Sequence, residues 1–217
     1  MAFYTPAFNL ERWKMMLPDP EKRWEDNGPV QRLARAWANA KDLPPKVRET
    51  FERCGDDQLR ELKMLLKIPE HPVALDDADH PAMNDLFVLA RSDSSLFTIM
   101  VAGAGNESFG PTVAEWQEGD GTAKRLDVLM ETLALRKREA LNAIRVEWLL
   151  RAASAVVEAK RYHAGHAMLL VHSFGDDDAP FGEFADFLGL YGLKAEINAM
   201  AAVQVNGVTL HLGWVSA

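Results

Sequence analysis

Residues 84–90 read NDLFVLA and, after five intervening residues, residues 96–110 read LFTIMVAGAGNESFG. Both stretches begin as apolar runs of strand length, and they are rich in the branched and aromatic residues that pack on a pleated, buried surface. A connection of five residues is short enough to close a hairpin. We therefore predict a β-hairpin that carries one carboxylate, Asp85, at the head of its first strand and small residues at the end of its second.

The chain before this hairpin is predicted to be mainly helical. After Gly28-Pro29, apolar residues recur with the three- and four-residue spacing of one buried helical stripe. A second helix is expected from Pro45 through Phe51, and a third over residues 57–67. The prolines of the segment 69–72 then favour extended chain and lead into a short strand at 73–75.

The chain after the hairpin alternates helices with strands. The Asn206-Gly207 pair, flanked by alternating apolar residues, is a strong signal for a tight hairpin. The wholly apolar run 168–171 predicts a central strand covered on both faces. The elements expected here are helices at 122–135 and 138–161, a strand at 168–171, a helix at 181–190 and a hairpin at 203–212. The whole order is that of an α/β sandwich with a mixed sheet.

Composition indicates one globular domain. The 217 residues are 48% hydrophobic and 26% charged, which is enough apolar sequence for a sizeable core. We expect a single domain over 1–217, with a helical N-terminal part (1–68), a core (69–174) and a C-terminal helix and hairpin (175–217). Because Cys54 is the single cysteine, no intramolecular disulfide can form, and a cytoplasmic, reducing location is expected. No apolar run approaches the roughly 20 residues of a membrane-spanning helix, so no membrane association is expected.

Net charge limits the function classes. With a net charge of −8, the chain as a whole does not favour non-specific electrostatic binding to nucleic-acid phosphates. A local cationic groove, or metal ions that bridge to phosphate, would still permit nucleic acid as a partner. A homodimer or a protein partner also stays open.

Several short phrases carry a resemblance to a known group of enzymes. They are Pro69-Glu70-His71, the first hairpin strand 84–90, Glu107-Ser108-Phe109-Gly110 and Arg151-Ala152-Ala153-Ser154-Ala155. Together with the order of elements, they resemble the PD-(D/E)XK nuclease superfamily, and more closely an uncharacterised bacterial family within it, over about residues 24–174. The resemblance implies a restriction-endonuclease-like αβββαβ sandwich with a mixed sheet, an N-terminal helical extension and a C-terminal β-hairpin.

The same resemblance assigns roles to four positions. It implies Asp85 as the first metal-binding acid, position 102 as the second acid, the carbonyl of Gly103 as a further ligand and position 104 as the catalytic lysine. Such a site uses Mg²⁺ or Mn²⁺ to activate water and to neutralise charge on a phosphodiester, and DNA is the implied substrate. Residues two apart lie on one face of a strand, so these side chains would meet.

Two of these positions carry no functional group, because residues 102 and 104 are both alanine. Loss of a metal-binding acid, or of a group that stabilises the transition state, typically costs about 10²-fold in rate or more. We therefore expect a metal-dependent nuclease that is inactive as written, with no bound metal. Two origins stay open: a deliberately inactivated variant, or a natural pseudo-nuclease that binds nucleic acid or a protein without chemistry.

Three further residues are candidates for supporting the site. Glu107 could replace the missing carboxylate, although it lies five residues past Ala102. Glu147 and Arg151 are four residues apart on the predicted long helix, where they would either reach the site or form a plain intrahelical ion pair. Elsewhere, His163 and His166 lack a nearby third metal ligand, and Asp176-Asp177-Asp178 is interpreted as an acidic turn.

Strand alternation gives one geometric expectation. Asp85, Ala102 and Ala104 should lie on one face at the edge of a mixed sheet, with their Cβ atoms open to a shared cleft. In that position longer side chains at 102 and 104 would cause little overpacking.

Overall fold

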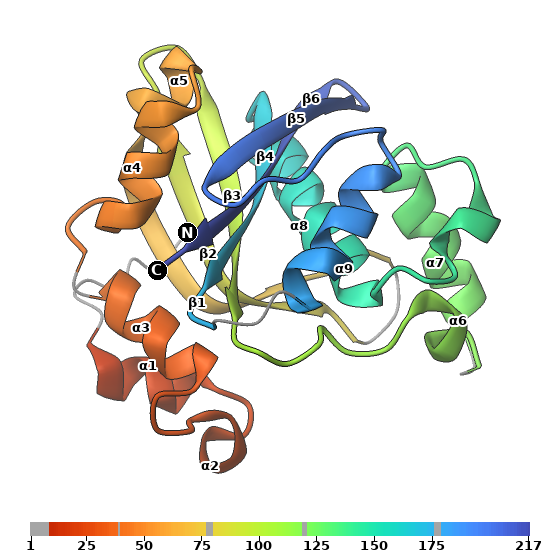
Figure 1. Cartoon of the computed structure of the whole chain (residues 1–217), viewed down its shortest axis with the longest axis horizontal. Coiled ribbons are helices and arrows are strands. Elements are labelled where there is room, and N and C mark those ends of the chain that lie inside the picture. The colour runs from red at the N-terminus through yellow and green to blue at the C-terminus, as the bar shows by residue number, and fades with distance from the viewer. Residues whose placement is uncertain (1–8, 39, 77–79, 119–120, 176–178) are drawn as a thin grey trace.

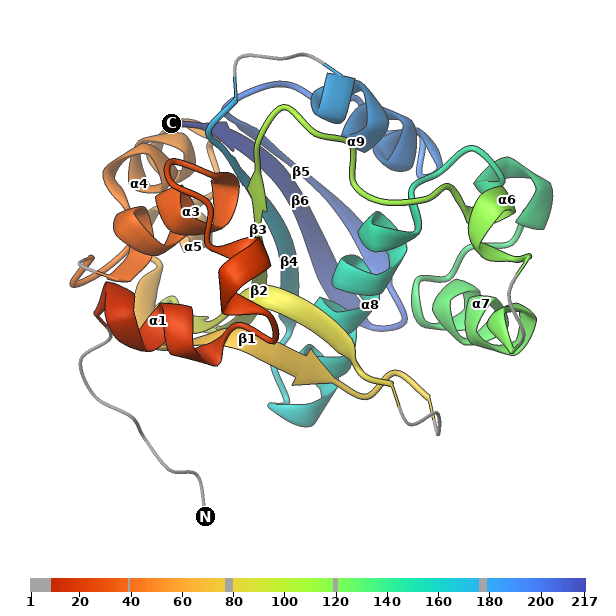
Figure 2. The ribbon, with the colours of Figure 1, turned by 90° about the horizontal axis from the view of Figure 1, so that it is seen from below.

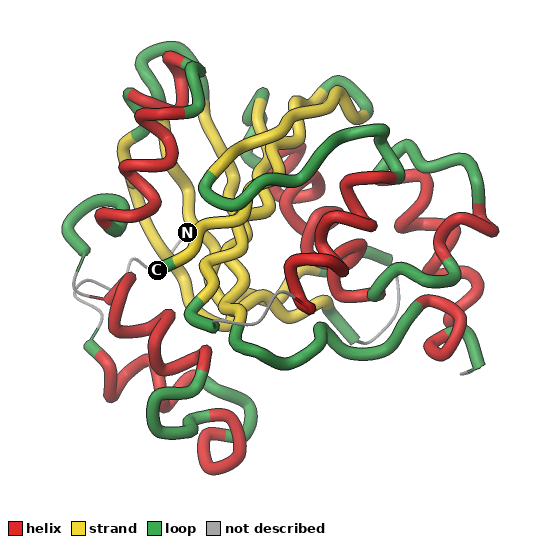
Figure 3. The backbone as a smooth tube through the Cα atoms, in the orientation of Figure 1, coloured by secondary structure: helices red, strands yellow, loops and turns green. Residues whose placement is uncertain are grey.

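The fold is a three-layer arrangement in which one mixed sheet separates two groups of helices (Figure 1). The computed structural model of the chain describes residues 9–38, 40–76, 80–118, 121–175 and 179–217. The colours of Figure 1 follow the chain from the N-terminal helices on one side of the sheet to the later helices on the other side. Figure 3 shows the strands as one continuous yellow layer between them.

The sheet, as far as the described residues go, has six strands in the order β1-β2-β3-β4-β6-β5. Strands β1, β2 and β3 pair antiparallel, β3, β4 and β6 pair parallel, and β5 pairs antiparallel with β6. The strand bounds are β1 (Lys63–Val73), β2 (Ala82–Arg91), β3 (Leu96–Ala104), β4 (His166–Ser173), β5 (Ala199–Val205) and β6 (Val208–Ser216). The parallel pairs lie in the middle of the sheet, where both faces are covered.

Each face of the sheet is covered by its own set of helices (Figure 2). The first set comes before the sheet in sequence: α1 (Leu10–Met16), α2 (Pro20–Arg23), α3 (Pro29–Ala38), α4 (Pro45–Arg53) and α5 (Asp57–Arg60). The second set is α6 (Val113–Trp116), α7 (Thr122–Thr132), a 3₁₀ turn (Arg138–Leu141), α8 (Val146–Arg161) and α9 (Ala179–Gly189). None of these described helices is both long and apolar enough to cross a membrane.

Two apolar cores result, one on each face. Alternate residues of the central strands feed them: Phe87 and Met100 join the core under α8, whereas Val88 and Ile99 join the core under α3 and α4. Alternation of side chains with period two is the cause, because successive residues of a strand face opposite sides. Trp148 is buried in the first core.

Much of the predicted element order is confirmed. The central hairpin forms as β2 and β3, and the apolar run 168–171 lies inside β4. The Asn206-Gly207 pair forms the turn between β5 and β6, with positive φ at both residues as a tight hairpin turn requires. The helices expected at 122–135 and 181–190 correspond to α7 and α9. The mixed α/β class is therefore correct.

Two predicted elements are wrong in their extent. The helix expected at 57–67 ends at Arg60, and the strand expected at 73–75 is the long strand β1, which begins at Lys63. The helical N-terminal part is therefore shorter than 1–68. The reason is tertiary, since pairing with β2 fixes residues whose local pattern also suits a helix. β1 tolerates Pro69 and Pro72 because it is an edge strand.

The long helix predicted over 138–161 is also divided. Only Val146–Arg161 is α-helical, and the 3₁₀ turn Arg138–Leu141 precedes it. Between them the backbone of Arg145 bridges to Thr112, and the amide of Val146 donates to the carbonyl of Pro111. These contacts hold the chain extended just before α8. The predicted acidic turn at Asp176-Asp177-Asp178 lies outside the described residues.

Candidate functional site

The structure brings the four resemblance-derived positions to one corner of the sheet. Asp85 stands near the start of β2, two residues before Phe87, which packs under α8. Ala102 and Ala104 belong to the same apolar core, so all three lie on the α8 face. A hydrogen bond of 3.0 Å from the Gly103 amide to Oδ2 of Asp85 links the two strands at this point.

The expectation of an open cleft around the two alanines is wrong. Both Ala102 and Ala104 are fully buried, with 0% exposure. They share their core with Trp148 and Ala152 of α8, which packs against β3. The cleft beside them, about 470 Å³ in volume, is instead lined by Asp85 and Gly103. Longer side chains at 102 and 104 would therefore displace packed neighbours.

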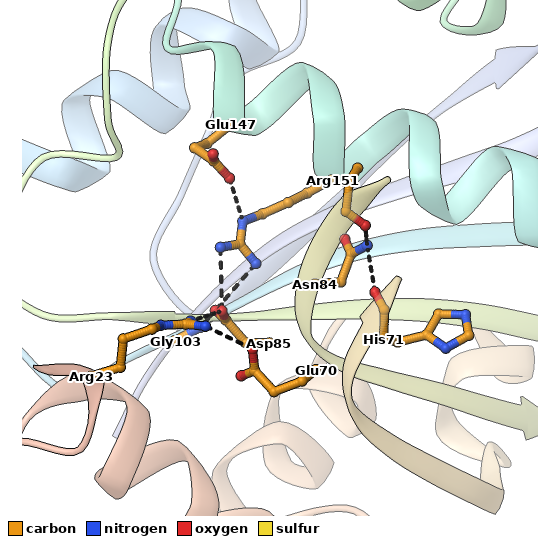
Figure 4. A network of polar contacts seen from close by, with 9 residues as sticks. Arg23, Glu70, His71, Asn84, Asp85, Gly103, Glu147 and Arg151 are labelled. Carbon is orange, nitrogen blue, oxygen red and sulfur yellow. Dashed lines mark hydrogen bonds and ion pairs between the residues drawn. The ribbon is translucent and has the colours of Figure 1, made fainter. Parts of the chain in front are cut away.

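Asp85 is surrounded by donors. Its side chain is 8% exposed and lies 3.1 Å from Nη1 of Arg151 through Oδ2, the oxygen that also accepts from Gly103. Its other oxygen, Oδ1, lies 3.4 Å from Nη2 of Arg23 and 3.4 Å from Nη2 of Arg151. Figure 4 shows the carboxylate between the two guanidinium groups, one from α8 and one from the N-terminal helices. The charge of Asp85 is thus balanced within the protein.

A second buried carboxylate, Glu70, lies beside Asp85. The strand pairs on either side, Pro69 with Leu86 and His71 with Asn84, place Glu70 opposite Asp85 on the adjacent strand. Like charges directly opposite each other on neighbouring strands destabilise a sheet. Arg23 relieves this repulsion, because its Nη1 lies 2.7 Å from Oε2 of Glu70 while its Nη2 reaches Asp85.

Three observations show that Glu70 is costly to hold in place. Its backbone has a φ of +49°, which is uncommon for a residue other than glycine. Burial, followed by the charge of Asp85, raises the pKa of Glu70 to about 7, although Arg23 and Arg151 act in the opposite direction. Oε1 of Glu70 is buried without a hydrogen-bond partner among the described residues.

Arg151 connects this corner to α8. Burial alone would lower the pKa of its guanidinium, but Asp85 and Glu147 raise it, so the side chain is held as a cation. Glu147 lies one turn earlier on α8, with Oε2 at 3.4 Å from Nε of Arg151. The pair is an intrahelical ion pair but not a plain one, because Arg151 also reaches Asp85. Glu107 is exposed on the loop after β3 and lines the cleft without joining this network.

Sequence reasoning missed two members of the network. Glu70 belongs to Pro69-Glu70-His71, one of the phrases that carry the resemblance, but it is not among the predicted site residues. The signal that could have identified it is an acidic residue within a proline-containing strand. Arg23 carries no local signal, because it lies 62 positions before Asp85 and meets it only through the path of α2 and α3. Asn84 adds a structural role: its side-chain amide donates to the carbonyl of His71 at 3.2 Å and ties β1 to β2.

The residues present do not suit a divalent metal. Mg²⁺ requires several oxygen ligands in near-octahedral geometry. Both oxygens of Asp85 already face guanidinium or amide donors, and positions 102 and 104 offer methyl groups. Across the described part of the chain, no group of three or more His, Cys, Asp or Glu side chains is arranged to hold a metal ion.

Comparison with known proteins places the chain in one family. No curated protein and no solved structure matches it. One family does, and its match extends over residues 6–217, so it includes the corner built by Arg23, Glu70, Asp85 and Arg151. The chain belongs to the family described as "Domain of unknown function (DUF6946)".

Proposed function

We propose that this chain is a nuclease-like protein of the restriction-endonuclease-like fold, and that it does not cleave nucleic acid as its sequence stands. The observation that carries the proposal is the hydrogen bond between Asp85 and Gly103, the residue that separates the two alanines. If the resemblance holds, that contact joins the position of the first acid to the strand that would carry the second acid and the lysine. Mg²⁺ or Mn²⁺ and a DNA substrate are proposed for the form that carries both missing side chains.

The topology supports the same proposal. A helical segment precedes the antiparallel strands β1, β2 and β3, and α8 then leads to β4, which pairs parallel to β3. This is the αβββαβ order of the proposed fold. Fold alone does not establish function, so the argument depends on the corner at Asp85.

The test is to supply the two missing groups together. We expect the double variant Ala102→Glu, Ala104→Lys to cleave DNA with Mg²⁺ or Mn²⁺, and EDTA or a further Asp85→Asn change to abolish the cleavage. Each single change should have little effect, because groups that act as a unit are strongly non-additive. Cleavage is measured on labelled single- and double-stranded DNA and on RNA.

Packing requires a matched control. Because both alanines are fully buried, larger side chains strain the core whatever their charge. The variant Ala102→Gln, Ala104→Met has nearly the same volume without the acid or the amine, so it separates chemistry from packing. A folded Ala102→Glu, Ala104→Lys protein that cleaves none of the nucleic acids would refute the nuclease proposal.

A second candidate is a pseudo-nuclease that binds nucleic acid or a protein partner without chemistry. The observation that favours it is the double contact of Asp85 with Arg23 and Arg151, which completes the corner without a metal ion. The unmodified chain would then bind labelled DNA or RNA in a salt-dependent manner, and Lys22→Ala, at an exposed residue of the cleft, would weaken binding. Absence of binding at low salt would exclude nucleic acid and leave a protein partner.

A further inference from the structure

The two edge strands of the sheet differ in how well they resist pairing with another chain. In β1, Pro69 and Pro72 have no N–H to donate. The register of β1 with β2 also shifts between Met64 and Leu66. Prolines and bulges of this kind prevent a further strand from adding to an edge. β5, which lies beside β6 at the other end of the described sheet (Figure 1), has the sequence AMAAVQV, an unbroken register with β6 and no proline or charged residue.

The hydrogen bonds of β6 show which of its residues face β5. The amide of Thr209 donates to the carbonyl of Gly165, just before β4, and the amide of Ala217, just after β6, donates to the carbonyl of Ser173 in β4. Both donors are odd-numbered. Because the backbone groups of successive strand residues point to opposite sides, the odd-numbered residues of β6 face β4 and the even-numbered residues face β5.

The outward-facing backbone groups of β5 follow from this alternation. Its odd-numbered residues lie opposite even-numbered residues of β6, so they are the ones that hydrogen-bond to β6. The N–H and C=O groups of Met200, Ala202 and Gln204 therefore point away from the sheet. Within the described residues, no other backbone segment hydrogen-bonds to these groups, and Ala202 and Gln204 are exposed. β5 thus presents a row of unpaired donors and acceptors.

A second copy of β5 is complementary to this edge. When two β5 strands lie antiparallel about a two-fold axis at Ala202, this residue faces its own copy, and Met200 faces Gln204 of the second copy. Each outward-facing N–H then meets an outward-facing C=O, because all three residues present both groups on the same side. The strand carries no charge, so no like charges are opposed across the axis.

We propose that this chain forms a two-fold dimer in which two β5 edges pair antiparallel about Ala202, so that the two sheets become one continuous sheet. The contact uses the same edge on both copies, so it closes and leaves only the two protected β1 edges at the ends. One pair of seven-residue strands is smaller than a standard protein interface, so a dimer of micromolar affinity is expected. The inference does not depend on the proposed function, since β3, β4 and β6 separate β5 from Asp85 on β2.

The test is the mass of the unmodified chain in solution, measured by sedimentation equilibrium from about 1 to 500 µM. We expect the weight-average mass to rise from that of one chain towards twice that value. Ala202→Lys and Ala202→Glu each oppose two like charges on the axis, and each variant should stay monomeric. An equimolar mixture of the two variants opposes unlike charges and should restore the dimer.

A matched variant separates the edge from a general effect of charge. Ala114→Lys makes the same change at an exposed position of α6, outside β5, and should dimerise like the unmodified chain. A chain that stays monomeric throughout the concentration range would overturn the inference and leave the edge to an extended strand of a different protein. A dimer that Ala202→Lys does not weaken would also overturn it, as would a mixture of monomeric Ala202 variants that fails to associate.

Hydrogen exchange tests the same pairing without any substitution, should the variants fail to fold. In the unmodified chain, the amides of Met200, Ala202 and Gln204 should exchange at least roughly ten-fold more slowly at the high end of the concentration range than at the low end. The amides of Ala201 and Val203 already donate to β6, so their exchange should change much less. Equal rates for the three outward-facing amides at both concentrations would refute the β5 interface.

Discussion

At the scale of a single residue, we expect the raised pKa of Glu70 to make the stability of this protein depend on pH near neutrality. Its pKa rises from an ordinary value of 4.5 to about 7 in the folded protein. The folded state therefore holds a proton that the unfolded chain has lost, so the contribution of this group to stability is fully present below pH 4.5 and is lost as pH rises through about 7. The loss should be on the order of 3 kcal/mol. Glu70→Gln cannot titrate, so its unfolding free energy should fall less between about pH 5 and pH 8.

The pH profile of Glu70→Gln must be subtracted from that of the unmodified protein, because buried histidines change the unfolding free energy with pH in the opposite direction. Burial lowers the pKa of His172 and of His211 to about 4, and these groups cost stability as pH falls below their ordinary value. They are present in both proteins, so subtracting the two urea-unfolding profiles isolates Glu70. Parallel profiles from about pH 5 to pH 8 would show that Glu70 has an ordinary pKa.

At the scale of an element, Lys67 of β1 closes the C-terminal end of α3. Its ammonium group donates to the carbonyls of Ala38 and Ala40 at 3.1 and 3.0 Å, and also to that of Trp37. A cation is favourable at this end of a helix, where carbonyls lack intrahelical partners. Burial lowers the pKa of Lys67. We expect Lys67→Met to lower the unfolding free energy by about 1–3 kcal/mol in chemical denaturation.

The control for Lys67 is Lys63→Met, on the same strand but at an exposed position. It should change stability by less than about 0.5 kcal/mol. Similar losses in the two variants would mean that the effect comes from β1 and not from the end of α3.

The pairing of β1 also shows why element bounds were hard to predict: residues 63–67 suit a helix locally, and only contact with β2 makes them a strand.

At the candidate site too, the features that depend on neighbouring residues could be predicted from the sequence, and those that depend on distant contacts could not. The hairpin of β2 and β3, with Asp85 at its head, follows from apolar runs and turn length within about 20 residues. Arg151 was identifiable from its spacing to Glu147 on one helix. Arg23 and the burial of Ala102 depend on how α2 and α8 pack against the sheet, and no nearby residue encodes that packing.

At the scale of the whole molecule, the two apolar cores share one sheet and should unfold together. Trp37 is buried in the core under α3 and Trp148 in the core under α8, and the strands between them contribute alternate residues to both. Neither helical layer retains its core without the central strands, so one cooperative transition is expected.

In Trp37→Phe and in Trp148→Phe, the urea midpoint from tryptophan fluorescence should coincide with that protein's own midpoint from far-UV circular dichroism. Trp37→Phe carries an additional loss, because it leaves Nδ1 of buried His172 without the 3.1 Å hydrogen bond from the indole. Because further tryptophans remain in both cores, a fluorescence transition that precedes the loss of ellipticity in either variant would show that side-chain packing is lost before the sheet unfolds.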